Sequence, residues 1–113
     1  MKTVQVWEQN KSLALQVAVA SDFGARLKGL MFRKSLTAEE GLLLLDCSAI
    51  HCCFMRFPID VVYLDGKMNV LGKETVKPWH LGSIFKGTEN VLELKAGAAE
   101  ELAAGMKLSL KEA

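Results

Sequence analysis

The sequence has no long apolar run and no excess of charge of either sign. In its 113 residues, 14 Lys and Arg face 13 Asp and Glu, which gives a formal net charge of +1. Such near neutrality provides no bulk attraction to nucleic acid or to an anionic membrane, and we expect neither as a partner. No stretch approaches the roughly 20 apolar residues of a membrane span. Polar residues also interrupt the apolar ones of the first 20 positions, so we expect no signal peptide.

Cysteine is scarce as well. The chain has three, an odd number, and Cys52 and Cys53 are adjacent, where a disulfide would require a strained ring. A reduced, cytoplasmic protein is therefore the simpler interpretation. We expect these small thiols and Cys47 to be buried core residues more often than reactive groups.

What the sequence does contain is alternation of apolar and polar residues, which is typical of strands. The length suits a single domain over residues 1–113. Strands are predicted over residues 4–8, 13–19, 42–45, 59–64, 68–71, 90–94 and 106–110. The pair Asp65-Gly66 between two apolar runs predicts a hairpin, with positive φ at both turn positions.

Three short helical pieces are predicted between the strands. Residues 21–31 have apolar spacing of three and four after an N-cap serine, and Thr37 and Glu40 have capping-box spacing for one helical turn. Residues 98–104 are predicted as a short helix that ends at Gly105. Residues 76–89 mix proline, glycine and scattered apolar residues, which indicates a long loop anchored on the body by Trp79, Leu81, Ile84 and Phe85.

Five motifs in register resemble the DUF192 family, also known as UPF0127. They are Gly29 to Arg33, Gly41 to Leu44, Ile50 to Asp65, Val91 to Leu94, and Ala96-Gly97. The resemblance runs from about Arg26 to Leu110 and implies a mainly β fold, a compact sandwich or distorted barrel with two or three short flanking helices. It implies no particular activity. Family members commonly have other residue types where Cys52 and Cys53 stand, so these thiols look particular to this chain.

The residues that match the family are the candidate ligand-binding residues, and a sixth comes from the long loop. They are Arg33, His51, Met55, Arg56, Asp60 and Trp79. In one interpretation the basic residues and Asp60 converge on a pocket for an anionic or polar small ligand, and Trp79 forms part of a lid. In the other, Asp60 locks a turn or pairs with an arginine, and Trp79 pins the loop.

Metal binding and cysteine catalysis remain alternatives. In a strand, His51 and Cys53 would point to one side about 7 Å apart, but a zinc site needs further ligands from Cys47, His80 or Asp60. Cys53, His51 and Asp60 also include the residue types of a nucleophile, a base and an orienting group. We expect no cofactor and no metal, and assign no catalytic residue.

Three functions therefore stay open. The first is a non-catalytic binding module with a polar pocket near His51, Arg56 and Asp60 for an unknown small ligand. The second is an enzyme that depends on a cysteine and histidine or on a metal. The third is an interaction module whose apolar surface docks a partner protein.

Overall fold

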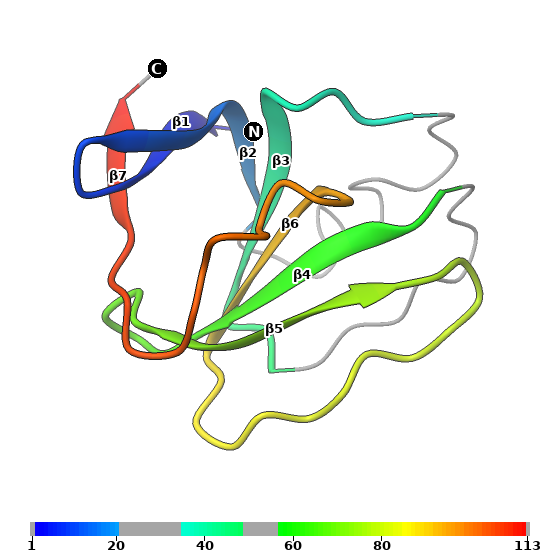
Figure 1. Cartoon of the computed structure of the whole chain (residues 1–113). Coiled ribbons are helices and arrows are strands. Elements are labelled where there is room, and N and C mark those ends of the chain that lie inside the picture. Colours follow the sequence, from blue (N-terminus) through cyan, green and yellow to red (C-terminus); the bar gives the residue numbers. More distant parts are fainter. Residues whose placement is uncertain (1, 21–34, 49–56, 113) are drawn as a thin grey trace.

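The computed structural model describes residues 2–20, 35–48 and 57–112. Within these ranges the chain forms one seven-stranded sheet and no helix (Figure 1). The strands are β1 (Lys2–Glu8), β2 (Lys11–Ala20), β3 (Glu40–Leu45), β4 (Ile59–Leu64), β5 (Val70–Val76), β6 (Asn90–Lys95) and β7 (Ser109–Glu112). Their order is β5-β4-β6-β3-β2-β1-β7, and only β2 and β3 are parallel neighbours. The predicted mainly β class is confirmed.

The central strands are apolar on both sides because both faces of the sheet are covered. All six residues of β4 are buried, and so are the first five of β6. Side chains alternate between the faces, so each strand contributes to two separate clusters. A sheet buried on both sides explains why these strands read as nearly continuous apolar runs.

We call the two sides of the sheet the first face and the second face. The first-face cluster includes Val6, Val17, Leu43, Val62, Leu92, Leu94 and Leu108. The second-face cluster includes Ala20, Leu36, Leu42, Leu44, Ile59, Val61, Tyr63, Val76 and Val91. The two faces therefore have separate cores and present separate surfaces for any site.

The sheet curls but does not close. Its edge strands are β5 and β7, and within the described ranges the backbone bonds from β5 to residues 105–107 lie near the start of β5. There Val70 N donates to Met106 O at 2.7 Å, Gly105 N donates to Val70 O at 2.9 Å, and Asn69 bridges to Lys107. The structure is thus an open curled sheet, and a closed barrel is not formed.

The predicted flanking helices are not seen in the described residues. Residues 21–31 lie wholly within the range 21–34, which is outside the described residues. At Thr37 one bond of a capping box forms, with Thr37 N donating to Glu40 Oε1 at 3.1 Å, and Glu40 N donates to the backbone carbonyl of Thr37 at 3.1 Å, as in a turn. They close a turn, and β3 begins at Glu40, because pairing with β2 extends the backbone there.

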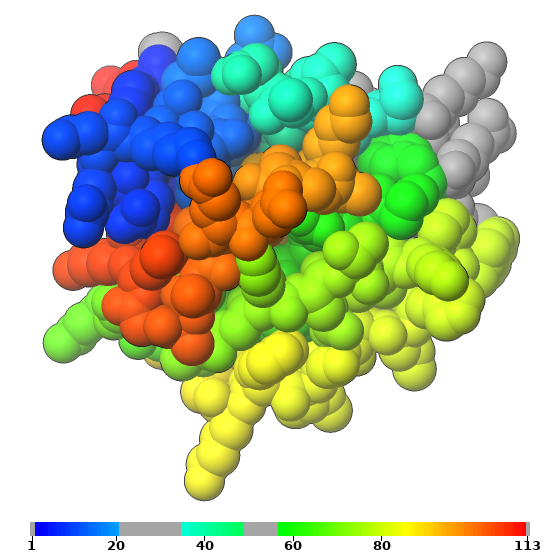
Figure 2. All heavy atoms as spheres, viewed as in Figure 1, coloured from blue at the N-terminus to red at the C-terminus, as the bar shows by residue number. Residues whose placement is uncertain are grey.

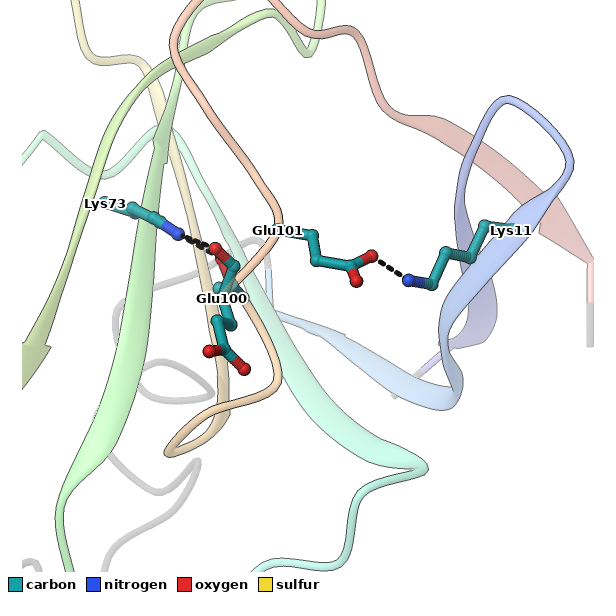
Figure 3. A network of polar contacts seen from close by, with 5 residues as sticks. Lys11, Lys73, Glu100 and Glu101 are labelled. Carbon is teal, nitrogen blue, oxygen red and sulfur yellow. Dashed lines mark hydrogen bonds and ion pairs between the residues drawn. The ribbon is translucent and has the colours of Figure 1, made fainter.

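Residues 96–105 form successive turns where a short helix was predicted. Their bonds span three residues, as from Ala98 N to Lys95 O and from Leu102 N to Ala99 O. Gly97 adopts φ +94, which is outside the helical region and suits only glycine well. The Lys73 ammonium donates to the carbonyls of Ala99, at 2.7 Å, and of Glu100 (Figure 3). These tertiary bonds replace those of a regular helix.

The predicted hairpin between β4 and β5 is confirmed, but its turn differs. The positive φ lies at Met68, and the Asp65 carboxylate closes the turn by accepting Lys67 N at 2.8 Å and Asn69 N at 2.9 Å. The side-chain hydrogen bond from Asn69 lowers the pKa of Asp65. No helix in the described ranges is long and apolar enough to cross a membrane.

Candidate functional site

The structure describes only part of the predicted site. Arg33, His51, Met55 and Arg56 fall within residues 21–34 and 49–56, outside the described ranges, as do Cys52 and Cys53. Asp60 and Trp79 are described, and they lie in different settings. The predicted convergence of these side chains on one pocket therefore stays a prediction.

Asp60 is buried on the first face and is fully engaged in bonds within the protein. Its position in β4 pairs with Leu94 of β6 and Thr75 of β5. One carboxylate oxygen accepts Thr75 Oγ1 at 2.7 Å, and the other accepts Gly97 N at 2.9 Å and Ala99 N at 3.0 Å. The carboxylate thus ties the turn at residues 97–99 to the sheet. This agrees with the interpretation in which Asp60 locks a turn.

Trp79 is 64% exposed and has φ 66. It lies in the connection between β5 and β6, where the neighbouring His80 is also exposed and its Nδ1 lies 2.9 Å from Pro78 O. The expectation that Trp79, Leu81 and Ile84 anchor this loop is wrong, because all three are among the exposed large hydrophobic residues. Only Phe85 of the four expected anchors packs against the second-face cluster.

The second face contains an acid that the sequence analysis did not single out. Glu93 of β6 lies between Leu42 of β3 and Val61 of β4, both members of the second-face cluster, and is 7% exposed. Burial raises its pKa from the ordinary 4.5 to about 7. No hydrogen bond or ion pair joins this carboxyl to another residue of the described ranges. Glu93 is therefore partly protonated at neutral pH.

The chain leaves and re-enters the described ranges on this same face. Ala20 and Leu36, which border residues 21–34, belong to the second-face cluster. Cys47 and Phe57, which border residues 49–56, pack against it. The described residues on either side of the two stretches that hold the candidate basic residues thus lie on the side of the sheet that holds Glu93.

A second acid on this face has the opposite electrostatics. Glu74 of β5 pairs with Val61 and accepts Tyr63 Oη at 2.6 Å and Ser83 N at 2.6 Å. Burial raises its pKa, but the hydrogen bonds from Tyr63 and Ser83 outweigh this effect and leave the pKa below the ordinary value. Glu74 therefore stays ionised and holds the β5–β6 connection, whereas Glu93 has no such partner in the described ranges.

A hollow of about 330 Å³ lies elsewhere, between the β1–β2 hairpin and the turns at residues 97–102. Four glutamates and one lysine contribute to its lining: Glu8, Glu39, Glu100, Glu101 and Lys11. Lys11 pairs with Glu101 across it (Figure 3), and this pairing lowers the pKa of Glu101. The hollow contains none of the candidate residues named from the sequence.

Among the residues that the structure describes, no three His, Cys, Asp or Glu side chains come close enough together to hold a metal ion. Of the metal-ligand candidates, the described ones are Cys47, Asp60 and His80. Cys47 lies beside the second-face cluster, and Asp60 lies on the first face.

Comparison with known proteins identifies the family. The family model DUF192, described as Uncharacterized ACR, matches residues 4–110. The chain belongs to the DUF192 family. One curated member is UPF0127 protein PH1112 from Pyrococcus horikoshii, which is 37% identical over 65% of this chain and 66% of that protein. Another is UPF0127 protein PF1050 from Pyrococcus furiosus, which is 30% identical over 83% of this chain and 84% of that protein.

Solved structures share the DUF192 fold of this chain. A protein of unknown function from Novosphingobium aromaticivorans superposes with a TM-score of 0.80 at 23% identity, over 95% of this chain and 83% of that one. A proposed transcription regulator from Sinorhizobium meliloti superposes with a TM-score of 0.77 at 21% identity, over 96% and 92%. At these identities the likeness concerns the fold alone.

Proposed function

We propose that this DUF192 protein is a non-catalytic, cytoplasmic binding module that holds a small polar or anionic ligand on the second face of its sheet, beside Glu93. The observation that carries the proposal is Glu93, an acid 7% exposed among the apolar residues of the second face, whose pKa is raised to about 7 by burial. Burying a carboxyl group costs free energy, so its retention on this face suggests a use for it.

The chemistry of the proposed site follows from the residue types. A protonated Glu93 offers an O–H donor, and Arg33, Arg56 and His51 offer N–H donors and positive charge. Donors of this kind suit a ligand with several acceptor oxygens, such as a carboxylate or phosphate. Met55 is the candidate for apolar contact with the same ligand. Asp60 lies on the first face, where it holds the turn at residues 97–99, and is not part of this site.

Thermal unfolding at pH 6.5 tests the proposal with phosphate, sulfate and citrate as probes. A ligand that binds only the folded state raises its stability by about 2.7 kcal/mol at a hundred times its Kd. We expect a saturable rise in Tm with at least one of these anions, and its loss in Arg56→Ala and in Glu93→Leu, which removes the O–H donor.

Lys107→Ala is the matched control, because it removes one positive charge from an exposed lysine beside the β5 edge. It should respond to the anion as the unmodified protein does. A panel without any saturable shift, or an equal loss of the shift in Lys107→Ala, would contradict a specific site on the second face.

A further inference from the structure

Three large apolar side chains stand out from the connection between β5 and β6. Trp79, Leu81 and Ile84 are 64%, 77% and 83% exposed, and they lie within six residues of one another. In Figure 2 this connection, in yellow, protrudes from the body of the molecule. Isolated exposed apolar residues are ordinary on protein surfaces, but three on one protruding segment indicate an interaction surface.

The backbone that carries these side chains is held in place. The Ser83 N–H and hydroxyl both donate to the Glu74 carboxylate, at 2.6 and 3.0 Å. The Phe85 ring packs on Tyr63 with 4.5 Å between ring centroids. His80 N also donates to Lys77 O at 3.2 Å. The outward position of Leu81 and Ile84 is therefore fixed by the bonds on either side of them.

The charges of this segment are of one sign. Exposed Lys77 and Lys86 flank the apolar residues, and no acid occurs between Glu74 and Glu89. Glu74 is bonded to Tyr63 and Ser83, and the Glu89 carboxylate lies against Gly66 in the β4–β5 turn. The segment thus presents apolar side chains with a basic border, although the whole chain is almost neutral.

We propose that residues 77–86 form a peripheral docking surface for an anionic lipid membrane. Leu81 and Ile84 enter the boundary between headgroups and acyl chains, Trp79 lies at headgroup depth, and Lys77 and Lys86 face the lipid phosphates. The near-zero net charge of the whole chain and its lack of a long apolar run led us to expect no membrane partner. Neither property describes a surface contact made by one short segment.

The size and shape of the segment favour a membrane over a protein partner. A specific protein interface typically uses roughly 20–30 residues on each side. Within the described ranges the docking surface comprises residues 77–86, on a protruding connection, and its border carries no acid to complement a basic partner. A bilayer accepts a small convex apolar tip, because lipids rearrange around it.

Co-sedimentation with vesicles tests the proposal. Vesicles of phosphatidylcholine with 30% phosphatidylglycerol should pellet about tenfold more protein at low salt than vesicles of phosphatidylcholine alone. High salt should reduce this difference. Leu81→Ser with Ile84→Ser should abolish binding, and Lys77→Gln with Lys86→Gln should remove the preference for anionic vesicles.

Leu110→Ser is the matched control, since Leu110 is the remaining large hydrophobic residue among those exposed in the described ranges, and it lies on β7. It should bind like the unmodified protein. In a Trp7→Phe background, Trp79 is the one remaining tryptophan and its emission should shift to shorter wavelength on binding.

Absence of binding to the anionic vesicles, or equal binding by the Leu81 and Ile84 double variant, would overturn the proposal. A dimer in sedimentation analysis that the double variant abolishes would also overturn it, because the occupant would then be a second copy of the chain. Specific capture by a protein partner without vesicle binding would assign the surface to that partner.

Discussion

Asp60 shows how one side chain can serve the fold where the sequence suggested a site. Its carboxylate holds two backbone N–H groups of a turn far along the chain and one hydroxyl of the neighbouring strand. Buried carboxylates that accept several such bonds are structural anchors. The same residue type at the surface would be free to contact a ligand.

Replacing Asp60 with alanine should lower the free energy of unfolding by about 3 kcal/mol, because the N–H groups of Gly97 and Ala99 lose their acceptor. Asp60→Asn keeps one acceptor oxygen and should cost about half as much. Urea denaturation measures both values. A loss below about 0.5 kcal/mol in Asp60→Ala, the range of ordinary surface changes, would contradict the anchoring role.

Glu93 should make the protein less stable as the pH rises. Its pKa of about 7 in the folded state lies above the ordinary value of 4.5, so between these values the folded state binds more protons than the unfolded state. The stability contributed by protonated Glu93 is complete below pH 4.5 and is lost as the pH rises through 7. From pH 5.5 to 8.5 the loss should be about 2 kcal/mol.

Glu93→Gln should remove this dependence, because glutamine stays neutral and has almost the same shape. Denaturant unfolding at pH 5.5 and 8.5 compares the two proteins, and the variant should be the more stable of the two at pH 8.5. An identical pH profile in both would mean that Glu93 does not titrate in this range.

At the scale of elements, the connection between β5 and β6 depends on a close approach to the sheet. The Phe85 ring lies so near Gly72 of β5 that a Cβ there would overlap it. Together with the bonds from Ser83 to Glu74, this contact positions the docking surface of residues 77–86. A glycine in a strand here marks a packing requirement.

Gly72→Ala should therefore lower the free energy of unfolding by about 2 kcal/mol, since the ring must move from its place on Tyr63. Gly66→Ala is the control, because the added Cβ meets only the Glu89 carboxylate, the end of a flexible side chain. Thermal and urea unfolding should show a much smaller change in the control. Equal losses at both positions would indicate a general effect of backbone entropy.

At the scale of the whole molecule, the segment from Gly105 to Glu112 joins the two sides of the curled sheet. Its first part bonds to the start of β5, and β7 pairs with β1. Leu108 lies between them and is buried in the first-face cluster, whereas every residue of β7 is exposed. Leu108 therefore provides the apolar burial of this segment. β7 stabilises the fold mainly through its backbone hydrogen bonds with β1.

A chain that ends after Leu108 should stay folded and lose about 2 kcal/mol, with increased self-association through the free edge of β1. Leu108→Ala in the full chain should cost about 3 kcal/mol without added association, because it creates a cavity and leaves the edge paired. Circular dichroism and size-exclusion chromatography distinguish the two results. An unfolded truncated chain would contradict this division of roles.

The strands were predictable and the turns were not, for a physical reason. Alternation of apolar residues is visible locally and identified β2, although its buried residues are Ala14, Val17 and Ala20. The shape of residues 96–105 depends on Asp60 and Lys73, which are distant in sequence, so local spacing predicted a helix. Part of the last strand was misplaced, because residues 106–108 bond to residues 68–70 and β7 begins only at Ser109.

The candidate site was harder to predict than the fold. Glu93 lies in a run of apolar residues, and a charged residue in such a run was a signal for a buried carboxyl. Glu93 is buried because β6 lies between β3 and β4 in the sheet. This position is known only from the strand order, which the local sequence does not show. Predictions for Arg33, His51, Met55 and Arg56 remain to be tested by experiment.

The strand order also has a consequence for synthesis on the ribosome. β1 comes first in the sequence, yet one of its two partners, β7, follows every other described strand. During translation one side of β1 therefore waits with open N–H and C=O groups until nearly the whole chain has emerged. We expect the nascent protein to be most vulnerable to aggregation in this interval, and chaperones that cover strand edges to matter most then.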